Sequence, residues 1–186
     1  MPRSGEDARR RLQDAAFELI RERGYDAVTT AEIAARAGVT ERTFFRHFPD
    51  KREVLFAGEE AFHTALTDGV MAAPEALNPM GVLLSAFRST VPMFEANRPF
   101  TEPMQTVIAR NAALQERVRT KTAGSIDALA AALRRRGVED GLAELAAQIG
   151  MSTFRHAVSA WLDDPASGLD GRVTDAFNQL RGLAAS

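Results

Sequence analysis

Five side chains in one short stretch are of the types that bind the edges of DNA bases. Arg42 and Arg46 can each donate two hydrogen bonds to O6 and N7 of a guanine, and Thr43 can hydrogen-bond a base or a phosphate. Phe45 offers a ring to a thymine methyl group, and His47 adds a polar ring. A surface helix has no other need of a Phe beside two arginines, so the set predicts contact with the major groove.

These side chains need a helix that is held at a fixed angle, and the preceding residues predict its support. Thr30 is a plausible N-cap for a two-turn helix in which Ile33, Ala34 and Ala37 share one face. Gly38 can adopt the left-handed conformation that ends such a helix. Ala34 is small where two helices would cross, so it permits the close approach of a helix-turn-helix.

The second helix of the motif is predicted from Thr40 to Phe48. The Thr40 hydroxyl can cap it, with Glu41 in the positively polarised first turn. Phe44 and Phe48 are four residues apart, so both face the first helix, and Pro49 ends the run. The base-reading candidates then face outward.

Several of these residues also have structural interpretations. The segment could be an ordinary αα-hairpin with a solvated charged face. Glu41 is more easily explained by the helix dipole, or by holding the next arginine, than by reading a cytosine. His47 could pack between helices with a satisfied nitrogen. Arg9, Arg10 and Arg11 could touch phosphates or form a solvated face.

Composition excludes several functional classes. The 186 residues contain no cysteine, which rules out disulfides, thiol catalysis and cysteine-based zinc sites and agrees with a reducing cytosol. No apolar run reaches the roughly 18 residues of a membrane span, and no signal peptide is apparent. The three histidines are far apart, and no glycine loop that could hold a phosphate occurs. We expect a cytoplasmic protein without catalytic residues, metal, cofactor or membrane association.

The charge balance by itself would not indicate DNA binding. Residues 1–58 contain eleven Lys and Arg against ten Asp and Glu, and the remainder contains twelve against fifteen. Affinity for DNA must therefore depend on the local placement of a few cations, and on a dimer that doubles them.

The rest of the chain is predicted to be helical, with no strand pattern and no repeat. We expect an all-α protein of about nine helices: a three-helix DNA-binding domain over residues 1–56 and a helical effector-binding and dimerisation domain over 57–186. The predicted helices cover residues 6–23, 30–37, 40–48, 50–73, 80–96, 100–109, 112–136, 139–162 and 170–184, with breaks that include Pro99 and Gly137.

The second domain is rich in Met and aromatic residues, which can form an ordinary core or line a pocket for an apolar ligand. The last two predicted helices carry more apolar surface than a peripheral hairpin needs, which favours a homodimer through them. The candidate ligand-binding residues are Phe62, Leu66, Phe87, Val91, Met104, Ile108, Met151, Phe154 and Arg155.

The N-terminal motif resembles the TetR/AcrR family of one-component transcriptional regulators. The resemblance covers roughly residues 9–56 without a gap. It is carried by Gly24, Tyr25, Thr29, Thr30, IAARAGVT (33–40), TFFRHFPDK (43–51), Val54 and Leu55.

This resemblance implies roles for individual residues. Thr30 would cap its helix and bond a phosphate, and Lys51, at the start of the next helix, would bind another phosphate. Phe45 departs from the family, in which Tyr is most common at this position, so a phosphate contact through that hydroxyl is missing. The implied DNA contacts are Thr30, Thr40, Glu41, Arg42, Thr43, Phe45, Arg46, His47 and Lys51.

Residues 80–162 resemble, more weakly, the subgroup with an acyl-CoA-like ligand-binding domain, through ANRPF, NAALQERV and Trp161. The resemblance implies a repressor, released from a pseudo-palindromic DNA operator by a small apolar or acyl-CoA-like effector. It also implies a homodimer in which the last two helices form a four-helix bundle. The alternatives are a helix-turn-helix protein that acts through a protein partner, and a small all-α enzyme.

Overall fold

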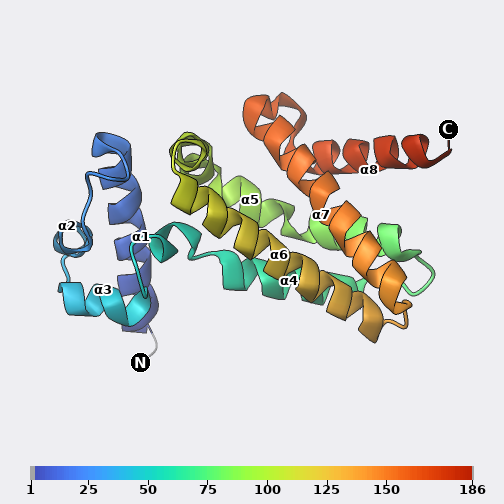
Figure 1. Ribbon diagram of the computed structural model, residues 1–186, viewed down its shortest axis with the longest axis horizontal. Helices are drawn as coiled ribbons and strands as arrows, with labels where there is room; N and C mark the ends of the chain where they lie inside the picture. Colours follow the sequence, from blue (N-terminus) through green and yellow to red (C-terminus); the bar gives the residue numbers. More distant parts are fainter. Residues whose placement is uncertain (1–2, 186) are drawn as a thin grey trace. The chain divides into compact units, whose positions relative to one another are not determined.

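The computed structural model describes residues 3–185, and this part of the chain is helical throughout, without a strand (Figure 1). The all-α prediction is confirmed, with eight α-helices instead of about nine. They are α1 (Arg3–Arg23), α2 (Thr30–Arg36), α3 (Glu41–His47), α4 (Glu59–Ala72), α5 (Pro79–Ala109), α6 (Ala112–Arg135), α7 (Asp140–Asp163) and α8 (Leu169–Ala185). Two short 3-10 helices, η1 (Glu53–Phe56) and η2 (Pro165–Ser167), lie between them.

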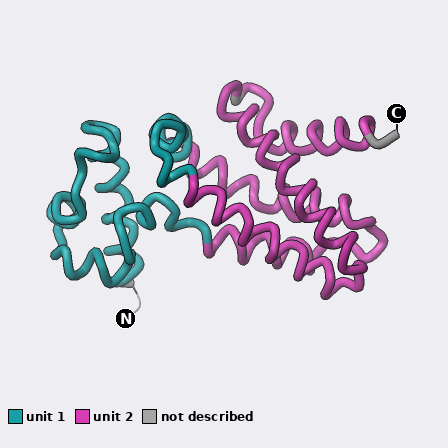
Figure 2. The backbone as a smooth tube through the Cα atoms, viewed as in Figure 1, with its two compact units in different colours: residues 1–59, 100–115 teal, residues 60–99, 116–186 magenta. Residues whose placement is uncertain are grey.

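The chain forms two compact units, shown in Figure 2. Unit 1 consists of residues 1–59 and 100–115, and unit 2 consists of residues 60–99 and 116–186. The segment 100–115, which lies far along the chain, therefore belongs to the same unit as the helix-turn-helix.

Unit 1 is built on the apolar face of α1. Leu12, Ala16, Leu19 and Ile20 of that face are almost fully buried, and so are Ile33 and Ala34 of α2 and Phe44 of α3. These residues pack in a single cluster that also contains Val28, Phe48, Val54 and Met104. Burying a large apolar side chain contributes about 1.5–3 kcal/mol, so this cluster fixes α2 and α3 on α1.

Two predicted helix starts are wrong. The N-cap of α2 is Thr29 and not Thr30: the Thr29 hydroxyl accepts from the backbone N–H of Glu32, whose carboxylate in turn accepts from the Thr29 backbone. The predicted helix over residues 50–73 is two elements, η1 and α4. Asp50 accepts hydrogen bonds from the backbone N–H groups of Arg52 and Glu53, which forms a turn after α3.

The predicted break at Pro99 is also wrong, because α5 continues through it to Ala109. A proline inside a helix removes one backbone hydrogen bond and costs about 3 kcal/mol. Tertiary packing offsets this cost within unit 1: Phe100 contacts Phe17 with ring centroids 5.1 Å apart, and Met104 is buried in the core. A local rule could not anticipate this packing.

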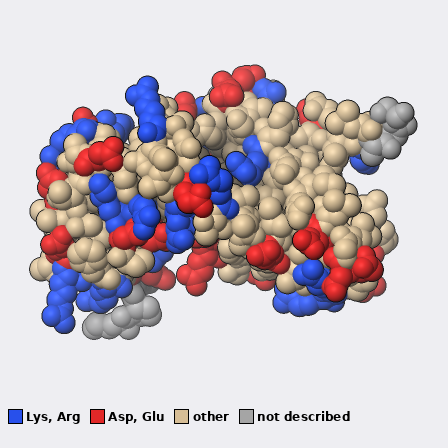
Figure 3. All heavy atoms as spheres, in the orientation of Figure 1, with Lys and Arg blue, Asp and Glu red and all other residues tan. Residues whose placement is uncertain are grey.

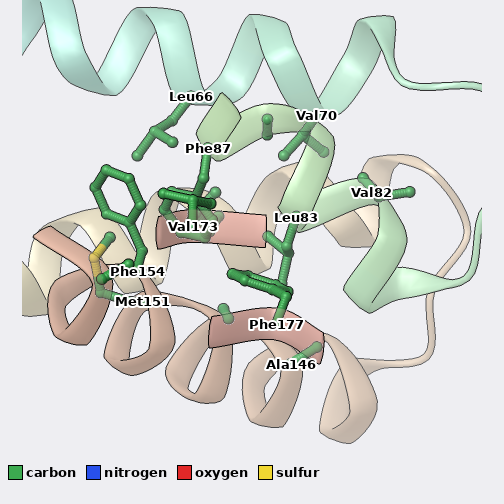
Figure 4. Close-up of a cluster of buried hydrophobic side chains, with 14 of the residues drawn as sticks. Leu66, Val70, Val82, Leu83, Phe87, Ala146, Met151, Phe154, Val173 and Phe177 are labelled. Atoms are coloured by element: carbon green, nitrogen blue, oxygen red, sulfur yellow. The ribbon is translucent and has the colours of Figure 1, made fainter. Parts of the chain in front are cut away.

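The core of unit 2 brings together α4, α5, α7 and α8 (Figure 4). Leu66 and Val70 come from α4, Leu83 and Phe87 from α5, and Phe154 from α7; all five are buried. Phe87 and Phe154 stack with centroids 4.4 Å apart and an interplanar angle of 11°. Within residues 3–185, no helix combines the length and apolar character required to cross a membrane.

Candidate nucleic-acid interface

The recognition helix α3 is capped and anchored from one side only. Thr40 is its N-cap, as predicted, and its hydroxyl accepts from the backbone N–H of Thr43. Phe44 and Phe48 are buried against unit 1, whereas Phe45 is 51% exposed with its ring edge-on to Phe44. A large aromatic ring on the surface is a candidate for contact with a ligand or a macromolecule.

Arg42 and Arg46 are exposed beside Phe45. The described residues offer neither guanidinium a hydrogen bond or an ion pair. Several other arginines of unit 1 are occupied: Arg36 binds Glu18 and Glu22, and Arg23 binds Glu32. Two cations that can fork onto a guanine therefore lie unengaged on the outward face of a short helix.

Two threonines predicted to meet DNA already have partners within the motif. The Thr30 hydroxyl donates to Glu41 Oε1 at 2.5 Å, which links α2 to the start of α3. Thr40 Oγ1 lies 3.1 Å from Thr43 Oγ1. Glu41 thus accepts from Thr30, a role that sequence reasoning did not include.

His47 lies at the end of α3, and its Nε2 is buried without a hydrogen-bond partner. Burial lowers the pKa of His47, and the charges of Arg46 and Arg9 lower it further. The alternative of a packed His47 with a satisfied nitrogen therefore does not describe Nε2. A neutral, inward-directed nitrogen is also poorly placed to contact DNA.

Lys51 occupies a turn before η1 and not the start of a helix. Its Nζ donates to the carbonyl oxygens of Tyr25 and Val28, each at 2.8 Å, and lies 4.1 Å from the centroid of the Tyr25 ring. The ammonium group that the resemblance assigns to a phosphate is held by the protein itself in this structure.

The arginine run at the start of α1 divides into three roles. Arg9 donates to the carbonyls of His47 and Ala57 and lies over the Phe48 ring, and Arg11 donates to the carbonyl of Ala37. Arg10 remains exposed and pairs with Asp7. Arg9 and Arg11 therefore bind the carbonyl ends of neighbouring helices, where a cation is favoured by the helix dipole.

Charge is mixed over the face of the molecule that Figure 3 shows, with acidic and basic side chains side by side. Any affinity of unit 1 for DNA must come from the position of individual cations, as the composition indicates.

The predicted ligand-binding residues separate into three groups. Leu66, Phe87, Val91, Met151 and Phe154 belong to the unit 2 core, and Phe62 packs against that core. Met104 and Ile108 belong to the core of unit 1 or pack against it, because α5 continues past Pro99 into that unit. Arg155 is exposed on α7. The structure therefore brings together only the first six, and the placement of the other three in the same site is corrected.

A polar pair within unit 2 was not anticipated. His63 Nε2 lies 2.6 Å from the hydroxyl of the buried Ser125, which also donates to the carbonyl of Lys121. Phe62, next to His63, contacts the rings of Phe94 and Phe154. No spacing rule links residues 62 positions apart, so the sequence gave no signal for this pair. Among the described residues, no group of three or more His, Cys, Asp or Glu is placed to hold a metal ion.

A capped helix-turn-helix with an exposed, basic and aromatic second helix defines a class of protein, the helix-turn-helix proteins. Residues 12–57 match the model of the tetR family of bacterial regulatory proteins. The chain belongs to this family.

One curated relative is the HTH-type transcriptional regulator TcmR of Streptomyces glaucescens, which is 36% identical over 76 residues. The match covers 41% of this chain and 34% of TcmR. Two further curated relatives are matched over 25% and 53% of their lengths. The sequence similarity is therefore partial.

Solved structures are similar over nearly the whole chain. The transcriptional regulator FadR from Bacillus subtilis, in complex with stearoyl-CoA, has a TM-score of 0.65 at 19% identity and covers 91% of this chain and 96% of its own. The SmeT–triclosan complex has a TM-score of 0.65 at 21% identity, covering 96% and 90%. At these identities the similarity establishes the fold.

Proposed function

We propose that this protein is a cytoplasmic DNA-binding transcriptional regulator that acts as a repressor. The observation that carries the proposal is the outward face of α3, where Arg42, Phe45 and Arg46 are exposed and both guanidinium groups are unengaged among the described residues. Two arginines with a ring between them match the guanine and thymine edges of the major groove. Membership of the tetR family supports the same function.

We further propose that unit 2 binds a small apolar or acyl-CoA-like effector. The support is the cluster of aromatic and Met side chains from α4, α5 and α7, which includes Phe62, Phe87, Met151 and Phe154 (Figure 4). The related folds of FadR and SmeT are solved with stearoyl-CoA and triclosan. An effector that binds one arrangement of this core better than another would shift the operator affinity.

A homodimer through α7 and α8 completes the proposal. Leu142 and Leu145 on α7 and Leu183 on α8 are large apolar residues that are 48%, 54% and 76% exposed in the single chain. A two-fold dimer would cover such residues and would present two copies of α3 to the half-sites of a pseudo-palindrome. Sedimentation of the wild type and of Leu145→Glu tests it, since a charge in this interface is expected to shift the protein toward monomer.

The function is tested by fluorescence-anisotropy titration against the protein's own promoter region and against random DNA at two salt concentrations. Specific binding typically exceeds non-specific binding by roughly 10³-fold or more, and selective binding to the promoter is the expected result. Stearoyl-CoA and apolar compounds are then added to the complex, and release of DNA is expected. Equal, weak binding to both DNAs under all conditions contradicts the proposed function.

A further inference from the structure

Lys51 is held at three points by the loop that precedes the helix-turn-helix. Its Nζ donates to two backbone carbonyls, those of Tyr25 and Val28, at 2.8 Å each. It also lies 4.1 Å from the centroid of the Tyr25 ring, within the range of a cation–π interaction. An ammonium group has three N–H donors, so two are used by the carbonyls while the charge faces the ring.

The position of this contact matters because it joins the two sides of the motif. Tyr25 and Val28 belong to the loop between α1 and α2, and Lys51 follows α3 by a few residues. Val28 is buried in the core of unit 1, and Thr29, the next residue, caps α2. The lysine therefore ties the entry to α2 to the segment that leaves α3.

The electrostatics of the site agree with an ammonium group that is removed from bulk water. Desolvation lowers the pKa of Lys51, and the carboxylate of Asp26 partly opposes this. Burial raises the pKa of Tyr25 to about 12, with a further contribution from Asp50. Tyr25 therefore stays a neutral phenol at neutral pH, as a cation–π partner that also packs in the core must.

We propose that Lys51 is a positioning residue, which fixes the loop from Tyr25 to Val28 against the exit of the recognition helix and does not bind a DNA phosphate. The inference rests on the proposed DNA binding. A phosphate contact would require Nζ to leave both carbonyls and the ring. Arg42 and Arg46, whose guanidinium groups are unengaged among the described residues, can meet DNA without any such loss.

A salt titration separates the two roles, because each phosphate contact contributes about 0.9 to the slope of log K against log salt. Lys51→Met keeps the apolar stem and removes the charge. It is expected to weaken operator binding by about tenfold, the equivalent of about 1.4 kcal/mol, and to lower the ratio of operator to random affinity while leaving the slope unchanged. The matched control, Arg42→Gln, removes a charge from the exposed face and is expected to flatten the slope. A flattened slope for Lys51→Met with the ratio preserved would overturn the inference.

A second measurement does not involve DNA. The ring current of Tyr25 is expected to shift the ε-methylene proton resonances of Lys51 upfield. Tyr25→Leu should abolish this shift, and the control Tyr25→Phe, which keeps the ring, should retain it. In urea unfolding, Lys51→Met and Tyr25→Leu should be non-additive, since each removes the same contact.

The two measurements also distinguish failure of the inference from failure of the proposed function. Wild-type protein that does not select the promoter contradicts the function, while the methylene shift and the double-mutant cycle still decide whether the contact exists. Unshifted methylene resonances with additive unfolding free energies would show that Lys51 is free, and they would overturn the inference even if the protein binds its operator.

Discussion

The hydroxyl of Thr30, in the first turn of α2, donates to Glu41 Oε1 in the first turn of α3 at 2.5 Å. Both residues were candidates for DNA contact, and in the free protein each occupies the other. The contact connects the two helices of the motif at the ends where their N–H groups are unpaired and favour a carboxylate. Glu41 also places a negative charge among the cations that would meet DNA.

Glu41→Gln is expected to strengthen binding to operator and random DNA alike, by about two- to fivefold at low salt, because it removes repulsion from the phosphates. The amide oxygen can still accept from Thr30, so the link between the helices is kept. Anisotropy titrations of both DNAs measure the effect. A loss confined to the operator would show instead that Glu41 reads a base.

Arg46→Ala is expected to reduce discrimination between operator and random DNA. A bidentate contact to guanine is worth about 1–3 kcal/mol of discrimination, which corresponds to roughly 5- to 150-fold. Arg10→Ala is the control, because Arg10 is an exposed arginine of α1 that pairs only with Asp7 among the printed contacts of unit 1. The recognition surface is misplaced if the two variants lose the same small amount of affinity for both DNAs.

The sequence was most informative where the structure depends on neighbouring residues. The left-handed Gly38, the Thr40 cap and the burial of Phe44 and Phe48 follow from local chemistry and helical period, and all are observed. The break at Pro99 was predicted by an equally local rule and is wrong, because packing within unit 1 overrides it.

The site was less predictable, because the partners of its polar groups lie far away in the chain. Arg9 reaches a carbonyl 48 residues away, and Lys51 reaches one 26 residues away. Residue type shows that such a side chain can donate, but only the fold decides whether a phosphate or a carbonyl accepts. Likewise, the apolar character of Met104 was correctly recognised, but its assignment to the effector site failed because α5 enters both units.

Arg9→Met should destabilise unit 1 by about 1–2 kcal/mol, because it removes the donors to the His47 and Ala57 carbonyls and leaves the stem in place. The cation over the Phe48 ring is lost as well. Urea unfolding followed by circular dichroism measures the loss. Arg10→Met, one residue away and exposed, should change the unfolding free energy by less than about 0.5 kcal/mol. Equal effects would mean that the Arg9 contacts contribute nothing.

Arg136→Lys is expected to destabilise unit 2 by about 1–3 kcal/mol, because the ammonium group cannot span the acceptors of the guanidinium fork. The wild-type side chain binds the end of α4 through the carbonyls of Val70, Met71, Ala73 and Pro74. Arg135→Lys is the control, since Arg135 is the exposed neighbour. Thermal unfolding followed by the fluorescence of the only tryptophan, Trp161, reports on this unit. Indistinguishable midpoints for the two variants would contradict the role assigned to Arg136.

His47 is expected to make unit 1 less stable in mild acid. Its folded pKa is lowered, by burial first and by Arg46 and Arg9 next, whereas an unfolded histidine titrates near about 6.5. As the pH falls below this value, the unfolded chain binds the proton more readily than the folded chain, so the unfolding free energy declines until the folded-state pKa is passed. Above it, stability is complete.

The test compares urea unfolding of the wild type and of His47→Phe at several pH values from about 7.5 to 5. Phe has a ring of similar shape that does not titrate, and the carboxylates common to both proteins cancel in the difference. The wild type should lose stability relative to the variant as the pH falls through about 6.5. Parallel curves would mean that Nε2 gains a partner in solution, and a difference of opposite sign would mean that the protonated ring is stabilised in the folded protein.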